Sequence, residues 1–109
     1  MLNTLNETLV QLEQKMSIYN GWCDRNIKDD VNLEHYYKVH KDVAKSMYEN
    51  AKSACNIAIS LYNQLRYADE HYPFDDFSDA QRAFDVQYDF MCRRLNDFNK
   101  AVQNCCYIK

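Results

Sequence analysis

Residues 32–72 of this sequence, forty-one in all, include neither glycine nor proline. The chain has a single glycine, Gly21, and a single proline, Pro73, so both residues that disfavour helix interiors lie outside the stretch. At about 100° per residue, the apolar side chains of the stretch fall on one helix face and on a second row beside it. This wide apolar surface predicts a long helix that packs against two neighbouring helices.

The segments on either side of this stretch carry narrower apolar seams. Large apolar side chains recur in steps of three and four between Leu2 and Tyr19, and again between Ala80 and Cys105. Such spacing is typical of the buried seam of bundles and coiled coils. The sequence Ser-Asp-Ala-Gln at residues 78–81 has the pattern of a capping box at a helix start. We therefore expect one all-α domain over residues 1–109, an elongated three-helix bundle with helices at about 3–25, 32–71 and 78–106.

The central helix is expected to be longer than the first helix that packs on it. Forty-one helical residues would span about 60 Å, and the first helix, at about 35 Å, is too short to cover them. Either the central helix bends or breaks near residues 53–60, or its uncovered length packs against a second copy of the chain. Small side chains favour the second outcome because they let helices approach closely. They predict a homodimer with a self-association seam at Ala51, Ala54, Cys55 and Ala58.

Composition restricts the partners and the compartment. The formal net charge is −3, with 13 basic and 16 acidic residues, so nucleic acid is not expected as a partner. No stretch is apolar enough to span a membrane, and the N-terminus lacks the basic and apolar regions of a signal peptide. The five cysteines are odd in number and fall mostly on helical core positions, which argues against a disulfide framework. These features predict a cytoplasmic protein that contacts no membrane.

The loop expected around Pro73 is unusual because it interleaves aromatic and acidic side chains. Residues 69–79 read DEHYPFDDFSD, with five carboxylates among one tyrosine and two phenylalanines. Loops that combine aromatic residues with charge are suited to gripping a partner, although the phenylalanines could instead tuck inward at an ordinary helix–helix turn. We predict a partner-binding surface formed by Tyr67, Asp69, Glu70, Tyr72, Phe74, Asp75 and Asp76.

Motifs for metal binding and for covalent chemistry are missing from the sequence. His35 and His40 are five residues apart and so lie on different helix faces, and no Cys-x-x-Cys or Glu-x-x-His pair occurs. Phosphate-cradling loops need several glycines, and Gly21 stands alone. We expect no metal, no cofactor and no enzymatic activity.

One short pattern provides an alternative. Arg66 and His71 are separated by four residues, an arrangement that resembles the Arg-x4-His element of HEPN-type ribonucleases. That family consists of small helical proteins that dimerise around an RNA phosphodiester. The resemblance covers six residues and implies that Arg66 contacts phosphate and that His71 performs acid–base chemistry. In place of the polar residue common after the arginine, this chain has Tyr67.

The preferred hypothesis is a protein-interaction module that inhibits or adapts a larger complex, as accessory or counter-defence proteins of viruses do. Nine tyrosines in a chain of this size exceed what a three-helix core is expected to hide, which also favours an interface. A further alternative is a helical protein that holds a small ligand such as a nucleotide in a tyrosine-lined cleft near lysines.

Overall fold

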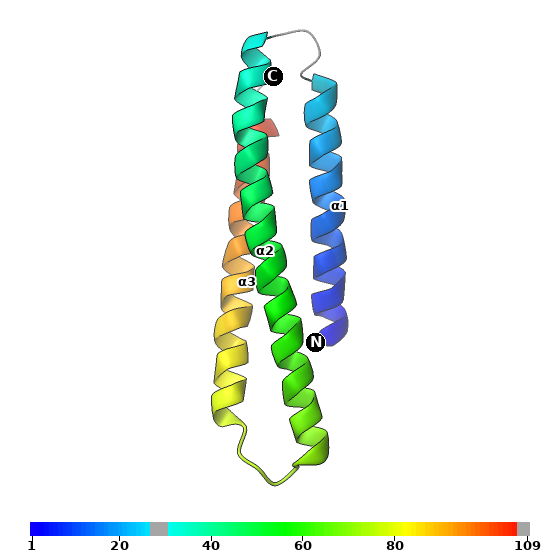
Figure 1. Cartoon of the computed structure of the whole chain (residues 1–109), viewed down its shortest axis with the longest axis vertical. Helices are drawn as coiled ribbons and strands as arrows, with labels where there is room; N and C mark the ends of the chain where they lie inside the picture. Colours follow the sequence, from blue (N-terminus) through cyan, green and yellow to red (C-terminus); the bar gives the residue numbers. More distant parts are fainter. Residues whose placement is uncertain (27–30, 107–109) are drawn as a thin grey trace.

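The structure, a computed structural model, describes residues 1–26 and 31–106; within these ranges the side chains of residues 26, 31–37 and 104–106 are not described. Three helices make up the described chain: α1 (Leu2–Asn26), α2 (Val31–His71) and α3 (Ser78–Cys106) (Figure 1). The described ranges contain no strand. The all-α three-helix bundle expected from the apolar periodicity is confirmed, with helix bounds within one residue of the predicted ones.

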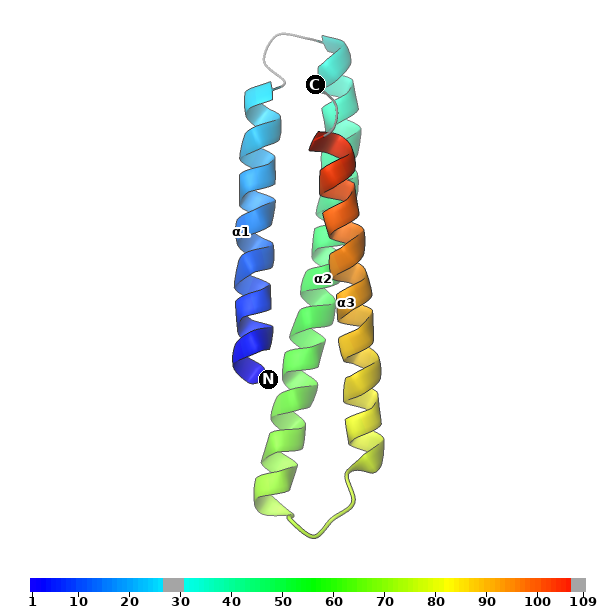
Figure 2. The same cartoon turned by 180° about the vertical axis from the view of Figure 1, so that it is seen from behind.

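The bundle is elongated, and α2 is its central element. The molecule measures 64 × 18 × 16 Å, and its radius of gyration of 18.1 Å exceeds the roughly 13 Å of a compact domain of this size. Both α1 and α3 pack mainly on α2 (Figure 2). The N-terminal end of α1 stops well short of the corner between α2 and α3. The last turns of α2 therefore pack against α3 alone.

The break considered near residues 53–60 does not form. α2 is one continuous helix of 41 residues. Its two neighbours are staggered: α1 lies beside the earlier part of α2, while α3 begins near the end of α2 and runs back along it. Because α3 covers the part of α2 that α1 does not reach, a continuous central helix remains packed along its length.

The core combines small side chains from α2 with large side chains from its neighbours. Each fully buried residue of α2 whose side chain is described is an alanine or a cysteine. The large buried side chains come from α1 and α3, including Leu5, Leu12, Phe84 and Phe98. Small residues on the central helix let the outer helices approach closely, and the larger side chains fill the space between them. The buried residues form two clusters along the bundle.

The predicted self-association seam lies inside this core. Ala51, Cys55 and Ala58 are completely buried and Ala54 is 7% exposed, all within a single chain. The Cys55 thiol donates a hydrogen bond to the Leu5 carbonyl oxygen of α1 at 3.4 Å, and burial raises the pKa of this thiol. Small side chains do mark close helix approach here, but the approaching helices are α1 and α3. The seam between two copies cannot use these four residues while the chain keeps this fold.

Lysines on the polar side of α2 connect it to α1. The Nζ atom of Lys41 lies 2.8 Å from Asp24 Oδ1, and that of Lys52 lies 3.5 Å from Glu13 Oε1. Lys52 also stands over the ring of Tyr48, 5.8 Å from its centroid. Tyr48 and Glu13 together raise the pKa of Lys52. Lys41 and Lys52 therefore face α1 and are already paired with its carboxylates.

Candidate functional site

The corner between α2 and α3 is a tight turn organised by Pro73. The Tyr72 amide still donates to the Ala68 carbonyl at 2.7 Å, and the Asp75 amide then donates to the Tyr72 carbonyl at 3.1 Å. The second bond closes a four-residue turn over residues 72–75 with proline in its second position, where the fixed φ of proline is preferred. Proline also cannot continue the helix, so the chain reverses immediately after His71.

This turn holds Phe74 at the apex of the corner, in water. The Phe74 side chain is 100% exposed, and Tyr67 and Tyr72 are 58% and 56% exposed. Phe77 is half-buried, so only one of the two loop phenylalanines turns inward. Burying a phenylalanine side chain is worth about 1.5–3 kcal/mol, a gain that Phe74 does not make in the free chain. The corner thus presents an unused apolar side chain at its tip.

Carboxylates surround the exposed aromatic residues. Asp69, Glu70 and Asp75 are exposed, and Glu70 accepts from Arg66 Nε at 3.4 Å. His71 Nδ1 lies 2.9 Å from the Tyr67 carbonyl oxygen, and its ring stacks on that of Tyr67 with centroids 4.0 Å apart. The corner is therefore a negatively charged, aromatic surface on the rigid ends of two helices.

Asp76 differs from the other carboxylates because it orders the start of α3. It accepts from both the hydroxyl and the backbone amide of Ser78, and these hydrogen bonds lower the pKa of Asp76. The capping box expected at residues 78–81 is replaced by this arrangement, since the Gln81 side chain instead donates to Asp85 Oδ1 at 3.1 Å. An aspartate next to a helix N-terminus also interacts favourably with the helix dipole. Asp76 thus has a structural role within the predicted site.

Replacing Asp76 with alanine is expected to lower the melting temperature at neutral pH by a few degrees, because Ser78 loses its acceptor. A carboxylate whose pKa is lowered on folding stabilises the fold above its unfolded pKa of about 3.9. That contribution is lost as the pH falls through the lower pKa of the folded state. Thermal melts at pH 7 and near pH 2 should therefore show a difference between Asp76→Ala and the parent only at the higher pH.

The neighbouring variant Asp75→Ala is the control for this measurement, because the Asp75 amide, and not its carboxylate, closes the turn. We expect Asp75→Ala to melt like the parent at pH 7. If both variants lowered the melting temperature equally, the special role of Asp76 would be refuted.

Arg66 and His71 are not brought together within the chain. In a continuous helix, residues five apart point about 140° away from each other. Arg66 forms an ion pair with Glu70, and the His71 ring lies against Tyr67. Each of the two residues therefore contacts a residue four positions away on its own face of α2. Nothing in this arrangement favours the ribonuclease alternative.

A cleft with one tyrosine and two lysines in its lining is present, but it is poorly suited to a phosphate. It lies between α1 and α2, and its lining includes Tyr48, Lys41 and Lys45. The same lining contains three carboxylates, and Lys41 is held by one of them, Asp24. The nucleotide alternative therefore gains no support from the charge of the cleft.

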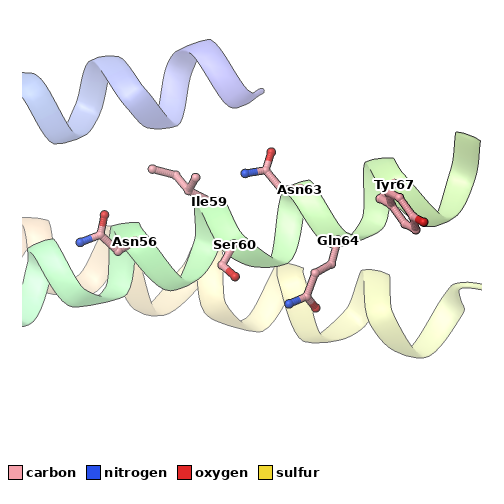
Figure 3. Close-up of a pocket in the computed structure, with 6 residues that line it drawn as sticks. All are labelled: Asn56, Ile59, Ser60, Asn63, Gln64 and Tyr67. Carbon is pink, nitrogen blue, oxygen red and sulfur yellow. The ribbon is translucent and has the colours of Figure 1, made fainter.

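A second groove runs along α2 past the N-terminal end of α1. Figure 3 shows its lining, which comes entirely from α2 and is mostly uncharged polar. It begins at Asn56 and ends at Tyr67, one turn before the corner. Asn56, Ser60, Asn63 and Gln64 supply hydroxyl and amide groups. The lining of the groove therefore carries no charged side chain.

Several exposed apolar residues were not singled out by the sequence analysis. Ile57, Val86 and Phe90 are each about half exposed, although they belong to the packed pair α2 and α3. The signal that could have found them is a large apolar residue just outside the seam of its helix. They lie away from the corner and form a separate surface.

The described side chains contain no cluster of His, Cys, Asp or Glu able to hold a metal ion. No described helix combines the length and the apolar character needed to cross a bilayer. Comparison with protein-family models, curated proteins and solved structures finds no match to this chain.

Proposed function

We propose that the protein is an interaction module that binds a partner protein through the α2–α3 corner and thereby inhibits or adapts a larger complex. The observation that carries the proposal is Phe74, a fully exposed aromatic side chain fixed at the apex of an ordered turn. Anchors of this kind fill a pocket on the partner and dominate binding energy. Tyr67 and Tyr72 extend the contact at small cost in side-chain entropy.

The charge of the corner indicates the chemistry of the partner. Asp69, Glu70 and Asp75 surround the aromatic residues, so the partner surface should be basic around an apolar pocket. Complementary charges of this kind accelerate association and exclude acidic competitors. The proposal includes the cytoplasm as the compartment in which binding occurs, because free thiols such as that of Cys92 stay reduced there.

Photo-crosslinking tests this surface directly. A photoreactive phenylalanine analogue at position 74 should capture the partner in extracts of the native host, where a probe at Ile18 should not. Ile18 is 69% exposed on α1 and is therefore a matched control for accessibility. Phe74→Ala should weaken binding of the captured protein about 30-fold or more, the factor for a hot spot of at least 2 kcal/mol.

Charge reversal provides the second arm of the test. The triple variant Asp69→Lys, Glu70→Lys and Asp75→Lys should abolish capture at position 74, while Asp76 is left in place to keep the start of α3. Equal capture at positions 18 and 74, or capture that survives the charge reversal, would disprove the proposed surface.

A further inference from the structure

A hollow lies between α1 and α3, the two helices that both pack mainly on α2. Its volume is about 380 Å³, which is within the range of pockets that hold small molecules. α1 contributes one wall with residues between 8 and 15, and α3 contributes the other with residues between 95 and 99. The hollow shares no residue with the α2–α3 corner that is proposed to bind a partner protein.

The floor of this hollow is apolar and belongs to the core. Leu12 of α1 and Phe98 of α3 are 3% and 1% exposed, and Leu95 packs against the same cluster of buried residues. That cluster contains side chains from all three helices, so the floor is fixed before any ligand arrives. An apolar group placed in the hollow would extend the core, and each methylene buried there is worth up to about 4-fold in affinity.

One charged side chain, that of Lys15, lines the hollow. Its ammonium group donates a hydrogen bond to Asn99 Oδ1 across the gap between α1 and α3. Asn99 is neutral, and Lys15 takes part in none of the ion pairs among the described side chains. An ammonium group has three N–H donors, so two of them remain for another acceptor. The positive charge of Lys15 is therefore held at the hollow without a counter-charge.

The charged and apolar parts of the hollow are arranged one after the other along the bundle. α1 and α3 run in the same direction (Figure 2), and their hydrogen bond sets Lys15 level with Asn99. Leu12 and Leu95 lie about 4.5 and 6 Å further toward the N-terminal ends of the two helices, and Thr8 lies about 10 Å from Lys15 along α1. The hollow thus has a cation at one end and an apolar floor that continues away from it.

Three other hollows on the described surface differ in this respect. The cleft between α1 and α2 holds two lysines but also three carboxylates, and the groove along α2 past the end of α1 has no charged side chain. A shallow depression between α2 and α3 is lined by apolar side chains and one glutamine. Of these four hollows, the one between α1 and α3 alone joins a cation without a counter-charge to a floor of core side chains.

We propose that this hollow binds a small carboxylate with an apolar tail, of the class of medium-chain fatty acids. The carboxylate accepts charge-assisted hydrogen bonds from the free donors of Lys15, and Gln11 in the same lining supplies a further amide donor. The tail lies over Leu12 and Leu95 and buries its methylene groups against them. This ligand binding goes beyond the partner binding proposed for the corner and does not depend on it.

The first test is a titration of the isotope-labelled chain with octanoate, followed by NMR. Octanoate should bind with a Kd of about 1 mM or lower and shift the backbone amide signals of residues 8–15 and 95–99. Two controls separate the head from the tail, because acetate has the charge without the tail and octylammonium has the tail with the opposite charge. Each control should bind at least about 10-fold more weakly than octanoate.

Three outcomes of this titration would overturn the proposal. The first is that octanoate does not bind. The second is that the signals it shifts lie outside the two walls of the hollow. The third is that acetate or octylammonium binds within about 10-fold of octanoate, which would leave the tail or the charge without a role.

A charge reversal tests the role of Lys15. Lys15→Glu should reverse the preference, so that octylammonium binds about 10-fold more tightly than octanoate. Lys45→Glu is the matched control, because Lys45 lines the cleft between α1 and α2 and should not affect octanoate. Circular dichroism checks that both variants keep the helix content of the parent. If Lys15→Glu still prefers octanoate, or if Lys45→Glu loses that preference equally, the assignment of the carboxylate to Lys15 is wrong.

A second variant supplies the missing counter-charge from inside the chain. Asn99→Asp keeps the size of the side chain and places a carboxylate against the ammonium group of Lys15. It should weaken octanoate about 10-fold or more, because the cation is then already neutralised. Unchanged binding of octanoate by Asn99→Asp would show that Lys15 does not hold the ligand.

Failure of this site and failure of the proposed partner surface are distinguishable. Lys15→Glu leaves the corner intact, so it should still crosslink to the partner through position 74. Conversely, Phe74→Ala should bind octanoate like the parent, and a loss of octanoate binding there would place the ligand outside the hollow between α1 and α3.

Discussion

Replacing Phe98 with alanine is expected to lower the free energy of unfolding by about 3–5 kcal/mol. Phe98 is 1% exposed and belongs to a cluster with Leu12 of α1, Ala51 of α2 and Val102 of α3. Its ring also lies against that of Tyr48. Because this cluster draws side chains from all three helices, removal of the ring leaves a cavity that no single helix can close by shifting.

Urea unfolding followed by circular dichroism measures this effect, and Phe74→Ala is the matched control. The same substitution at the exposed corner removes no packing within the chain and should change stability by less than about 0.5 kcal/mol. A domain of this size is typically stable by about 5–15 kcal/mol, so Phe98→Ala removes a large fraction of the total. Equal effects of the two substitutions would show that the core is not packed as described.

The burial of Phe98 could be predicted from the sequence because helical periodicity alone determines it. The seam from Ala80 to Cys105 places Phe84, Met91, Phe98 and Val102 on one stripe, and all four are buried. The positions of the helices followed from the same periodicity and from Pro73. Periodicity reports which face of a helix is covered, but not which element covers it.

The alanine-rich stripe of α2 illustrates this limit. Small residues indicate that another helix comes close, and a second copy of the chain satisfies that requirement as well as α1 and α3 do. The sequence holds no information on the stagger of α1 and α3, which decides how much of α2 they cover. The alanine stripe alone therefore did not indicate that α1 and α3 are the helices that approach it.

At the corner, too, the sequence predicts one part of the site but not the other. Its mixture of carboxylates and aromatic residues identified the segment, because composition is read directly from the sequence. Which phenylalanine faces water depends on the hydrogen bond from Asp75 to Tyr72, and the role of Asp76 depends on its distance from Ser78. These are properties of turn geometry, which residue type alone does not determine.

The double variant Ala51→Leu and Ala58→Leu is expected to lower the free energy of unfolding by about 2–6 kcal/mol. Both residues are completely buried between α2 and its neighbours. Adding a bulky side chain to a packed core costs about 1–3 kcal/mol at each site. The two sites are about 10 Å apart along the helix, so their effects should be nearly additive.

Urea unfolding at a concentration where light scattering gives the mass of a single chain measures this effect. Ser53→Leu, an exposed position on the same helix, is the control and should change stability by less than about 0.5 kcal/mol. If the alanines instead formed a seam between copies, leucine there would leave the monomer as stable as before. A destabilised monomer is therefore the result that places the alanine stripe in the core of one chain.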